Sequence, residues 1–112
     1  FVMKGLIYKI VDNTNNNTYY GSTIQKINHR MNDHRECLRK YKSGKKTTGL
    51  TEAVKIMINE DYYHEIVEEI DYNEKVELLK RERWWIENNE CINKVIPTRT
   101  NKEFQHYYYE KN

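Results

Sequence analysis

The apolar and polar positions of the first 22 residues predict a β-hairpin. Residues 6–11 read Leu-Ile-Tyr-Lys-Ile-Val, a run of β-branched and aromatic residues that favours a strand. The next six residues are Asp, Thr and four asparagines, a composition typical of a turn because Asn and Asp tolerate left-handed backbone conformations. The chain then returns as a second strand over residues 18–22. With a loop of about four residues, Tyr8 and Tyr19 would face each other across the hairpin.

Residues 26–41 carry the periodicity of an amphipathic helix. The stripe combines three apolar residues with one histidine and comprises Ile27, Met31, His34 and Leu38. Arg30 lies at the edge of this stripe, four residues before His34, so both side chains are expected to point the same way. The pattern therefore predicts a helix with a cation and an imidazole along the border of its buried face.

Two more helices and one strand complete the predicted fold. Thr51 is expected to cap the amino end of a helix that runs to about residue 59, and Asn73 that of a helix that runs to about residue 88. Between them, residues 62–70 alternate in polarity and predict a third strand. Three strands and three helices in so short a chain predict a small α+β domain.

Glu82 is the residue that fits its predicted helix least well. Taken at 3.6 residues per turn, it lies at the centre of an apolar stripe formed by Leu78, Leu79, Trp85 and Ile86. An ionised carboxylate in such a place is unfavourable unless something pairs with it. An arginine or a metal ion would be the simplest partner, so the sequence points to a site around Glu82.

Length and composition narrow the class of protein. A chain of 112 residues is expected to form one domain, here residues 1–98, followed over 99–112 by the start of a C-terminal helical extension or tail. No apolar run is long enough to cross a membrane. Cys37 and Cys91 lie far apart without metal-site spacing, which favours two reduced thiols in a reducing intracellular compartment, either nucleus or cytoplasm. A monomer is expected for the isolated domain.

Charge is small overall and uneven along the chain. The formal net charge is only +2. Residues 26–46 contain eight Lys or Arg residues against two acidic ones, whereas residues 52–90 contain twelve acidic residues against five basic ones. Either the two segments neutralise each other on solvated helix faces, or the basic segment forms a phosphate-binding surface. Both interpretations stay open on charge alone.

Arg30, His34 and Glu82 together favour phosphate chemistry. A guanidinium and a carboxylate that meet in one cleft would serve a scissile phosphate and a divalent cation. The alternative is a structural ion pair between Arg30 and Glu82. A zinc site formed by His29, His34 and Cys37 is disfavoured because the set lacks a convincing fourth ligand.

Two short motifs resemble those after which the GIY-YIG nuclease family is named. The first reads Leu-Ile-Tyr over residues 6–8, and the second reads Tyr-Tyr-Gly over residues 19–21. Both differ from the family pattern only at apolar positions. The resemblance covers residues 5–95 and extends to a helical arginine and histidine, a glutamate before an aromatic-Ile pair and a closing asparagine: Arg30, His34, Glu82 and Asn93. It implies a small three-stranded antiparallel sheet flanked by helices.

The resemblance implies a metal-dependent endonuclease that hydrolyses DNA phosphodiester bonds. Tyr8 would act as the general base, although a phenol with a pKa of about 10 would need a nearby cation such as Lys26 or Arg30. Tyr19 would orient water or phosphate. Arg30 would hold the phosphate oxygens, and Glu82 would hold one Mg²⁺ or Mn²⁺ ion.

Two further site residues and a DNA-binding surface follow from the same resemblance. His34 would contact the phosphate, and Asn93 would shape the site by hydrogen bonding. The cations expected to bind DNA belong to the first predicted helix: Lys26, Arg30, Arg35 and Arg39. Many family members carry a separate DNA-binding region that is not visible here, which favours a determinant of specificity in a further C-terminal region or in a partner.

Two other functions stay open on the sequence. One is a nucleic-acid or protein binding module that kept the fold and lost turnover, with residues 26–46 as its contact surface. The other is a purely structural domain, in which Arg30 neutralises Glu82 and the tyrosines pack as sheet aromatics with hydroxyls at the surface. The DNA target, the choice between a nick and a double-strand break, and the biological role have no signature in the sequence.

Overall fold

The computed structural model of the chain describes residues 2–44, 50–100, 102 and 103. Its elements follow in the order β1 (Met3–Asp12), β2 (Thr18–Thr23), α1 (Ile27–Lys42), α2 (Glu52–Met57), β3 (Tyr62–Tyr72) and α3 (Lys75–Glu87). The three strands and three helices predicted within this range are therefore confirmed. Lys45 and Lys46 lie outside the described residues, as does most of the C-terminal helical extension expected over residues 99–112. Across the described part of the chain, none of the helices has the length and apolar content needed to span a membrane.

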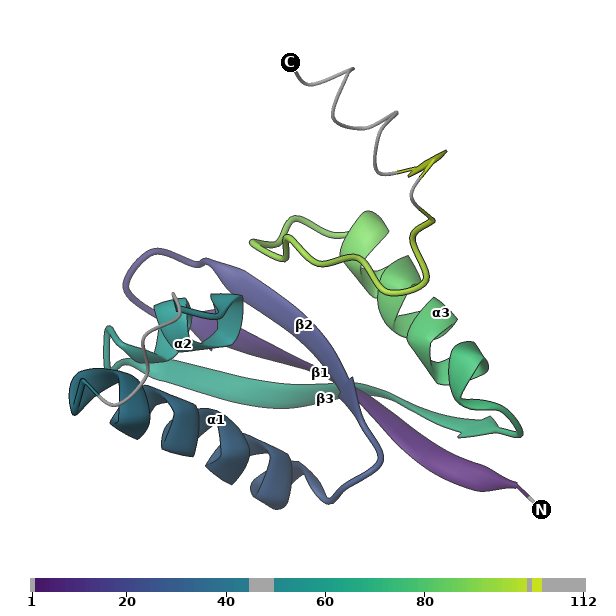
Figure 1. Ribbon diagram of the computed structural model, residues 1–112, viewed down its shortest axis with the longest axis horizontal. Helices are drawn as coiled ribbons and strands as arrows, with labels where there is room; N and C mark the ends of the chain where they lie inside the picture. Colours follow the sequence, from purple (N-terminus) through teal and green to yellow (C-terminus); the bar gives the residue numbers. More distant parts are fainter. Residues whose placement is uncertain (1, 45–49, 101, 104–112) are drawn as a thin grey trace.

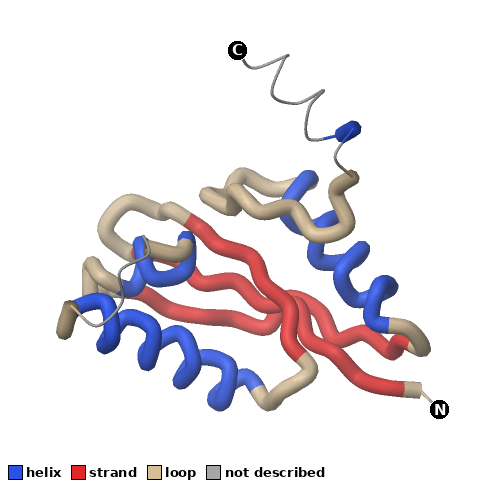
Figure 2. Tube along the Cα trace, viewed as in Figure 1, coloured by secondary structure: helices blue, strands red, loops and turns tan. Residues whose placement is uncertain are grey.

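The three strands form one antiparallel sheet in the order β2–β1–β3 (Figures 1 and 2). β1 is central because the hairpin places β2 on one side of it and the longer connection through α1 and α2 places β3 on the other. Figure 1 shows α1 and α3 on either side of β2. This arrangement confirms the predicted α+β fold with a small three-stranded antiparallel sheet.

The register of the hairpin differs from the prediction. Tyr8 pairs with Gly21, and Tyr19 pairs with Ile10. Six residues, 12–17, connect the last cross-strand pair, Val11 and Thr18, rather than about four, and the two extra residues move the partner of Tyr8 from position 19 to position 21. The expectation that the two tyrosines are direct cross-strand neighbours is therefore wrong. Their rings still share one face of the sheet, with centroids 6.4 Å apart.

Asp12 organises this turn from inside the protein, where its side chain is fully buried. Its Oδ1 accepts hydrogen bonds from the backbone N–H and the hydroxyl of Thr14, at 2.9 and 2.6 Å. Its Oδ2 accepts a bond from Asn59 Nδ2 at 2.6 Å. Burial raises the pKa of the carboxyl, but the bonds from Thr14 and Asn59 outweigh burial, and the pKa lies below its ordinary value. The hairpin is thereby tied to the chain just after α2.

Helices pack on both faces of β1. Tyr8 and Ile10 lie in a core with buried residues of α1 and α2. Ile7 points to the opposite face, where it packs with Leu78 of α3. α3 can approach because Gly5 has no side chain: a Cβ atom there would lie 2.8 Å from a methyl carbon of Leu78.

The predicted N-cap is correct for α2 and wrong for α3. Thr51 is the N-cap of α2 and accepts a hydrogen bond from Val54 N–H at 3.3 Å, as expected. The N-cap of α3 is Glu74, so the prediction of Asn73 is wrong by one residue. The side chains of Glu74 and Glu77 bond each other's backbone N–H groups in a capping box, and this reciprocal cap replaces the single bond that Asn73 would make.

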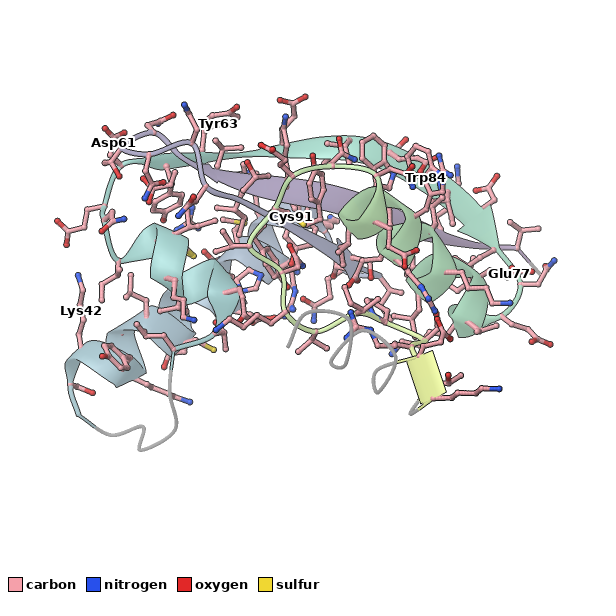
Figure 3. All side chains as sticks on the ribbon, turned by 90° about the horizontal axis from the view of Figure 1, so that it is seen from above. Lys42, Asp61, Tyr63, Glu77, Trp84 and Cys91 are labelled. Atoms are coloured by element: carbon pink, nitrogen blue, oxygen red, sulfur yellow. The ribbon has the colours of Figure 1, made fainter. Side chains whose placement is uncertain are left out.

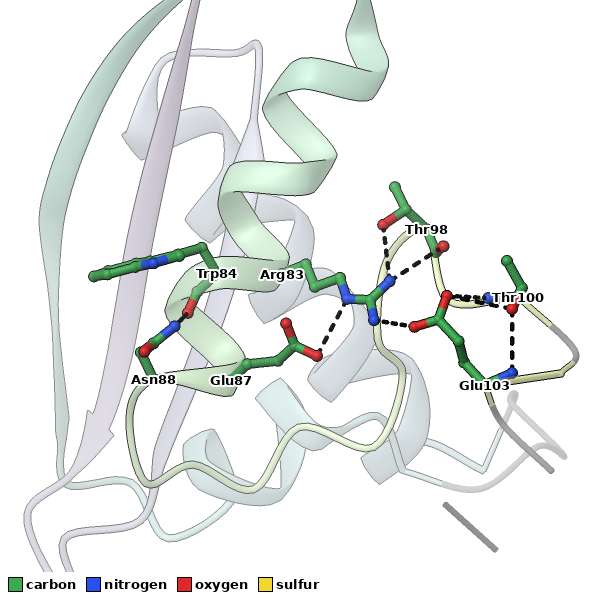
Figure 4. Close-up of polar contacts among 7 residues, drawn as sticks. All are labelled: Arg83, Trp84, Glu87, Asn88, Thr98, Thr100 and Glu103. Atoms are coloured by element: carbon green, nitrogen blue, oxygen red, sulfur yellow. Dashed lines mark hydrogen bonds and ion pairs between the residues drawn. The ribbon is translucent and has the colours of Figure 1, made fainter. Parts of the chain in front are cut away.

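The chain beyond α3 is held to this helix by Arg83 (Figure 4). Arg83 forms ion pairs with Glu87, at 3.2 Å, and with Glu103, and it donates a hydrogen bond to the carbonyl of Thr98 at 3.4 Å. Glu103 also accepts a bond from the backbone N–H of Thr100 at 3.3 Å. These contacts span the domain boundary expected at residue 98, which stays a prediction.

Candidate active site

The hydroxyl of Tyr8 lies inside the protein and has two polar neighbours. The side chain is fully buried. Its oxygen accepts a hydrogen bond from Arg30 Nε at 3.1 Å and lies 2.8 Å from Nε2 of His34. Both partners come from α1, where residues four apart fall on one face. The interpretation of Tyr8 as a sheet aromatic with its hydroxyl at the surface is therefore wrong.

His34 is neutral in this position at ordinary pH. Only 6% of the residue is exposed, and burial, followed by the charge of Arg30, lowers its pKa to about 4. A neutral imidazole has one donor and one acceptor nitrogen. With the proton on Nδ1, Nε2 can accept the phenolic hydrogen of Tyr8 while Arg30 donates to the same oxygen.

Gly21 makes room for the phenol of Tyr8 on the neighbouring strand. The two residues are paired across the hairpin. A Cβ atom at position 21 would lie 2.6 Å from the oxygen of Tyr8 and 2.7 Å from its Cζ. Real side-chain carbons do not come so close, so only glycine lets the ring lie over β2 and place its hydroxyl beside α1.

Tyr19 lies beside this cluster from the same face of the sheet. Its ring centroid is 6.0 Å from that of His34, in an edge-on arrangement. Burial raises the pKa of its phenol, and the neighbouring Tyr8 and Glu82 raise it further. Tyr19 therefore keeps its proton and can act as a neutral hydrogen-bond donor.

Glu82 reaches the site from α3 and is held by β2. Ser22 donates its hydroxyl hydrogen to Oε1 of Glu82. Burial raises the pKa of the carboxyl, while the bonds from Ser22 and the charge of Arg30 partly lower it again. Within the described residues Glu82 forms no ion pair with Arg30, whose Nε is bonded to Tyr8. The structural ion pair considered as an alternative is therefore not formed.

Asn93 fastens the chain after α3 to the free edge of β2. Its Nδ2 donates to the carbonyl of Tyr20 at 2.7 Å, and its Oδ1 accepts from the N–H of Tyr20 at 2.9 Å. The backbone N–H of Ile92 also donates to the carbonyl of Thr18 at 2.8 Å. The segment therefore satisfies backbone groups that an edge strand would leave open. Asn93 also lines the cleft, and its role in shaping the site stays a prediction.

A cleft passes between these side chains and has two arms that meet at Arg30 and Glu82. One arm, of about 290 Å³, is lined by Tyr19, His34 and Asn93, and we call it the Tyr19 arm. The other arm, of about 280 Å³, extends toward the start of α3. Its lining residues include Ser22, Ile24, Gln25 and Lys75, and we call it the Lys75 arm. Five of the six predicted catalytic residues line this cleft, and Tyr8 lies beneath it.

A larger hollow, of about 1110 Å³, lies between the hairpin turn and the chain after α3. Five of its fourteen lining residues are asparagines, and it contains neither Tyr8 nor Arg30 nor Glu82. The cleft is therefore the better candidate for chemistry, because the buried phenol, the imidazole, the guanidinium and the carboxylate converge there.

The carboxylate of Glu82 suits a divalent cation of the magnesium type. Mg²⁺ is bound through one or two carboxylates and completes its shell with water and phosphate oxygens. The two arms leave space for such ligands on either side of Glu82. In the part of the chain that the structure describes, no group of three His, Cys, Asp or Glu side chains comes together. The disfavoured zinc set of His29, His34 and Cys37 is therefore not assembled.

The cations expected to bind DNA have different surroundings. Arg30 lines the cleft, whereas Arg39 is paired with Glu36 at 2.5 Å along α1. Arg35 donates to the hydroxyl of Tyr62 at 3.3 Å. Lys26 is the N-cap residue of α1 and makes no side-chain capping bond. The DNA-binding role of these residues stays a prediction.

Mutual neutralisation of the basic and acidic segments is visible at one end of the molecule. Lys42, in the last turn of α1, pairs with Glu60 at 2.8 Å. Figure 3 shows Lys42 at the opposite end of the molecule from Glu77 of α3. This ion pair joins the basic segment to the acidic one at the end of α1.

Ser22 and Gly21 are the site residues whose roles the sequence did not reveal. Ser22 follows the second motif and has no chemical signature of its own, because its partner Glu82 is 60 residues away. Gly21 belongs to the second motif, but the motif does not show which side chain lies against it. The signal that could have exposed both is the pairing register, because Tyr8 opposite Gly21 places Ser22 on the other face, toward α3.

Comparisons with known proteins agree with this geometry. The model of the GIY-YIG catalytic domain matches residues 4–95. The fold is also similar to that of a solved structure, the catalytic domain of the intron endonuclease I-TevI in a variant with one glutamate replaced by alanine. Identity is 24%, the TM-score is 0.62, and the match covers 88% of this chain and 100% of that one. A search of curated proteins found no match. The chain therefore belongs to the GIY-YIG catalytic domain family and has the fold of a nuclease.

Proposed function

We propose that the chain is an endonuclease that hydrolyses DNA phosphodiester bonds with the help of one divalent metal ion, Mg²⁺ or Mn²⁺. The observation that carries this proposal is the surroundings of the Tyr8 hydroxyl oxygen. Nε2 of His34 lies 2.8 Å from it, and Nε of Arg30 lies 3.1 Å from it. A buried phenol with both a proton acceptor and a cation at its oxygen is suited to proton transfer.

Tyr8 acts as the general base toward the attacking water, and His34 receives its proton. As the water oxygen bonds to phosphorus, one water hydrogen moves to the phenolic oxygen, and the phenolic hydrogen moves to Nε2 of His34. Burial raises the pKa of Tyr8, whereas the charge and hydrogen bond of Arg30 lower it. A direct transfer to His34 lets the phenol act without a free phenolate. This role replaces the phosphate contact that the family resemblance implies for His34.

Arg30 and Tyr19 bind the scissile phosphate from the cleft. The Nε of Arg30 is engaged with Tyr8, so its terminal nitrogens are the ones that face phosphate oxygens. Tyr19 keeps its proton and donates a hydrogen bond to phosphate or water. When the bond from phosphorus to the 3′ oxygen breaks, that oxygen takes a proton from solvent water, and the products carry a 5′-phosphate and a 3′-hydroxyl.

Glu82 holds the metal ion, with Ser22 fixing the orientation of its carboxylate. The bound cation would neutralise charge on the phosphate and on the leaving oxygen. Asn93 has a structural part in this scheme, because it secures β2 through Tyr20. Its effect on the reaction is to keep the Tyr19 arm of the cleft in shape.

The proposal is tested by incubating supercoiled plasmid with the protein and Mg²⁺. We expect metal-dependent relaxation, lost when EDTA is added and lost in Glu82→Ala. Glu87→Ala is the matched control, because Glu87 lies on the same helix, is exposed, and lines neither arm of the cleft. Its activity should equal that of the wild type.

Two results would contradict the proposal in different ways. Cleavage by Glu82→Ala at the wild-type rate would remove Glu82 as the metal ligand. A folded wild-type protein that binds plasmid and never cuts it, at any Mg²⁺ or Mn²⁺ concentration, would favour the binding module instead.

A further inference from the structure

The two arms of the cleft differ in charge. The Tyr19 arm includes two carboxylates beyond the central pair, Asp33 and Glu52. The Lys75 arm includes no acidic residue other than the shared Glu82, and it adds the ammonium group of Lys75. Because like charges repel and opposite charges attract across a cleft, only one of these arms favours a second phosphate beside the scissile one.

Among the residues that the structure describes, Lys75 is an exposed cation without an acidic partner. No acidic side chain of the described residues lies within 4.0 Å of its ammonium group. It is also the first residue of α3, where the helix dipole disfavours a positive charge by roughly 0.3–1 kcal/mol. The position therefore gains no helix stability from lysine, and the charge stays available to a ligand.

The remaining side chains of the Lys75 arm suit the other parts of a nucleotide. Gln25 offers an amide that can donate to sugar or base. Ile24 is 64% exposed, and it lines the same arm. An apolar surface of this kind can pack against a deoxyribose or the face of a base.

We propose that the Lys75 arm binds the nucleotide that adjoins the scissile phosphate, with Lys75 paired to its phosphate and Ile24 against its sugar or base. This proposal rests on the proposed endonuclease function and gives the substrate strand a direction. From Arg30 the strand passes along the loop after β2 toward the first turn of α3, and not over α2. The charges on α1 beyond Arg30 then contribute less to binding than Lys75 does.

The test is the salt dependence of DNA binding by Lys75→Gln. The probe is a fluorescein-labelled 20-base-pair duplex in EDTA, which prevents cleavage, with the dissociation constant measured by fluorescence anisotropy at several salt concentrations. Each lost phosphate contact should reduce the slope of log Kd against log salt by about 0.9. We expect that reduction for Lys75→Gln. The matched control is Lys80→Gln, since Lys80 is an exposed, unpaired lysine of α3 that lines neither arm.

Equal slopes for Lys75→Gln and Lys80→Gln, with both variants melting like the wild type, would overturn the proposal, and so would a wild type that binds no duplex. A wild type that binds with a slope dependent on Lys75, yet never cuts plasmid, would support the binding arm and reject the endonuclease. Where cleavage occurs, Lys75→Gln should raise KM about tenfold and leave kcat unchanged, whereas Ile24→Ser should raise KM without changing the salt slope.

Discussion

Nε2 of His34 lies 2.8 Å from the hydroxyl oxygen of Tyr8, although the two residues are 26 positions apart in the chain. The contact exists because α1 buries Met31 and His34 along one stripe and presses that stripe against β1. A phenol that would otherwise keep its proton in a buried setting thus has an acceptor within hydrogen-bond reach. This pair is the feature of the fold from which the proposed chemistry starts.

Tyr8→Phe should stop cleavage and leave the fold intact. The ring remains to fill the core, while the oxygen that relays the proton is lost, so we expect kcat to fall by about 10²–10⁴-fold. Plasmid relaxation gives the rate, and thermal melting followed by circular dichroism reports the fold. Tyr63→Phe is the control, since Tyr63 is 43% exposed and lines neither arm of the cleft. A rate within threefold of wild type would move the general base to another residue.

Stability should fall as pH drops from about 6.5 to about 4, with His34 as the cause. In this interval the unfolded chain binds a proton on His34 that the folded protein does not, so acid favours unfolding. Glu82, whose pKa is raised above 4.5, acts in the opposite sense in the lower part of the interval. Glu82 contributes equally to the wild type and to His34→Gln, so comparing the two proteins cancels its effect.

Urea denaturation of wild type and His34→Gln across this pH range isolates the imidazole. The wild type should lose on the order of 2–3 kcal/mol more than the variant between pH 6.5 and pH 4. Parallel pH curves for the two proteins would mean that the pKa of His34 is the same in the folded and unfolded states, which would contradict a buried imidazole held neutral by its surroundings.

Gly21→Ala should disturb the site through Tyr8. The added methyl group would overlap the phenol, so we expect a loss of about 1–3 kcal/mol in stability and a severe loss of cleavage. The same substitution in a Tyr8→Ala background should be much less harmful, because the phenol is gone. If the stability loss is the same in both backgrounds, the contact between Gly21 and Tyr8 is not what requires glycine.

Asn93→Ala should loosen the edge of β2. Two hydrogen bonds to the backbone of Tyr20 are lost, which should cost about 1–3 kcal/mol and speed amide exchange at Tyr20. Asn88→Ala serves as the comparison, because Asn88 is exposed and donates one side-chain bond, to a carbonyl of its own helix. Unchanged exchange at Tyr20 would show that the edge is held by other contacts.

The sequence was most informative where structure is determined locally. The stripe that contains Met31 and His34 has the period of a helix, and both residues are buried in α1. Thr51 caps α2 with its own side chain, which accepts a bond from the N–H of Val54, three positions on, so the cap could be predicted from a few neighbouring residues. The asparagine-rich turn predicted a hairpin, and the motifs within its two strands indicated the family.

The sequence was least informative where two distant segments meet. Two extra residues in the hairpin connection place Tyr8 opposite Gly21, and no local pattern encodes that count. The partner of Glu82 was sought among arginines and metals, yet its oxygen accepts a bond from Ser22, a common residue 60 positions away. The interpretation of residues 26–46 as one basic surface failed to separate Arg30, which lines the cleft, from Arg39, which is paired.

The clamp that Asn93 forms on β2 also bears on self-association. A three-stranded sheet has two outer strands that could template pairing with another molecule, and here they are protected differently. On β2 the amide of Asn93 and the backbone of Ile92 already occupy hydrogen-bonding groups. On β3, Glu68 and Asp71 are paired with Arg81 and Lys4, whereas the exposed carboxylates of Glu65 and Glu69 form no ion pair within the described residues and would repel a second copy. Truncation of the chain before residue 92 would leave β2 without this protection, and fibrous aggregation through that strand would be the expected consequence.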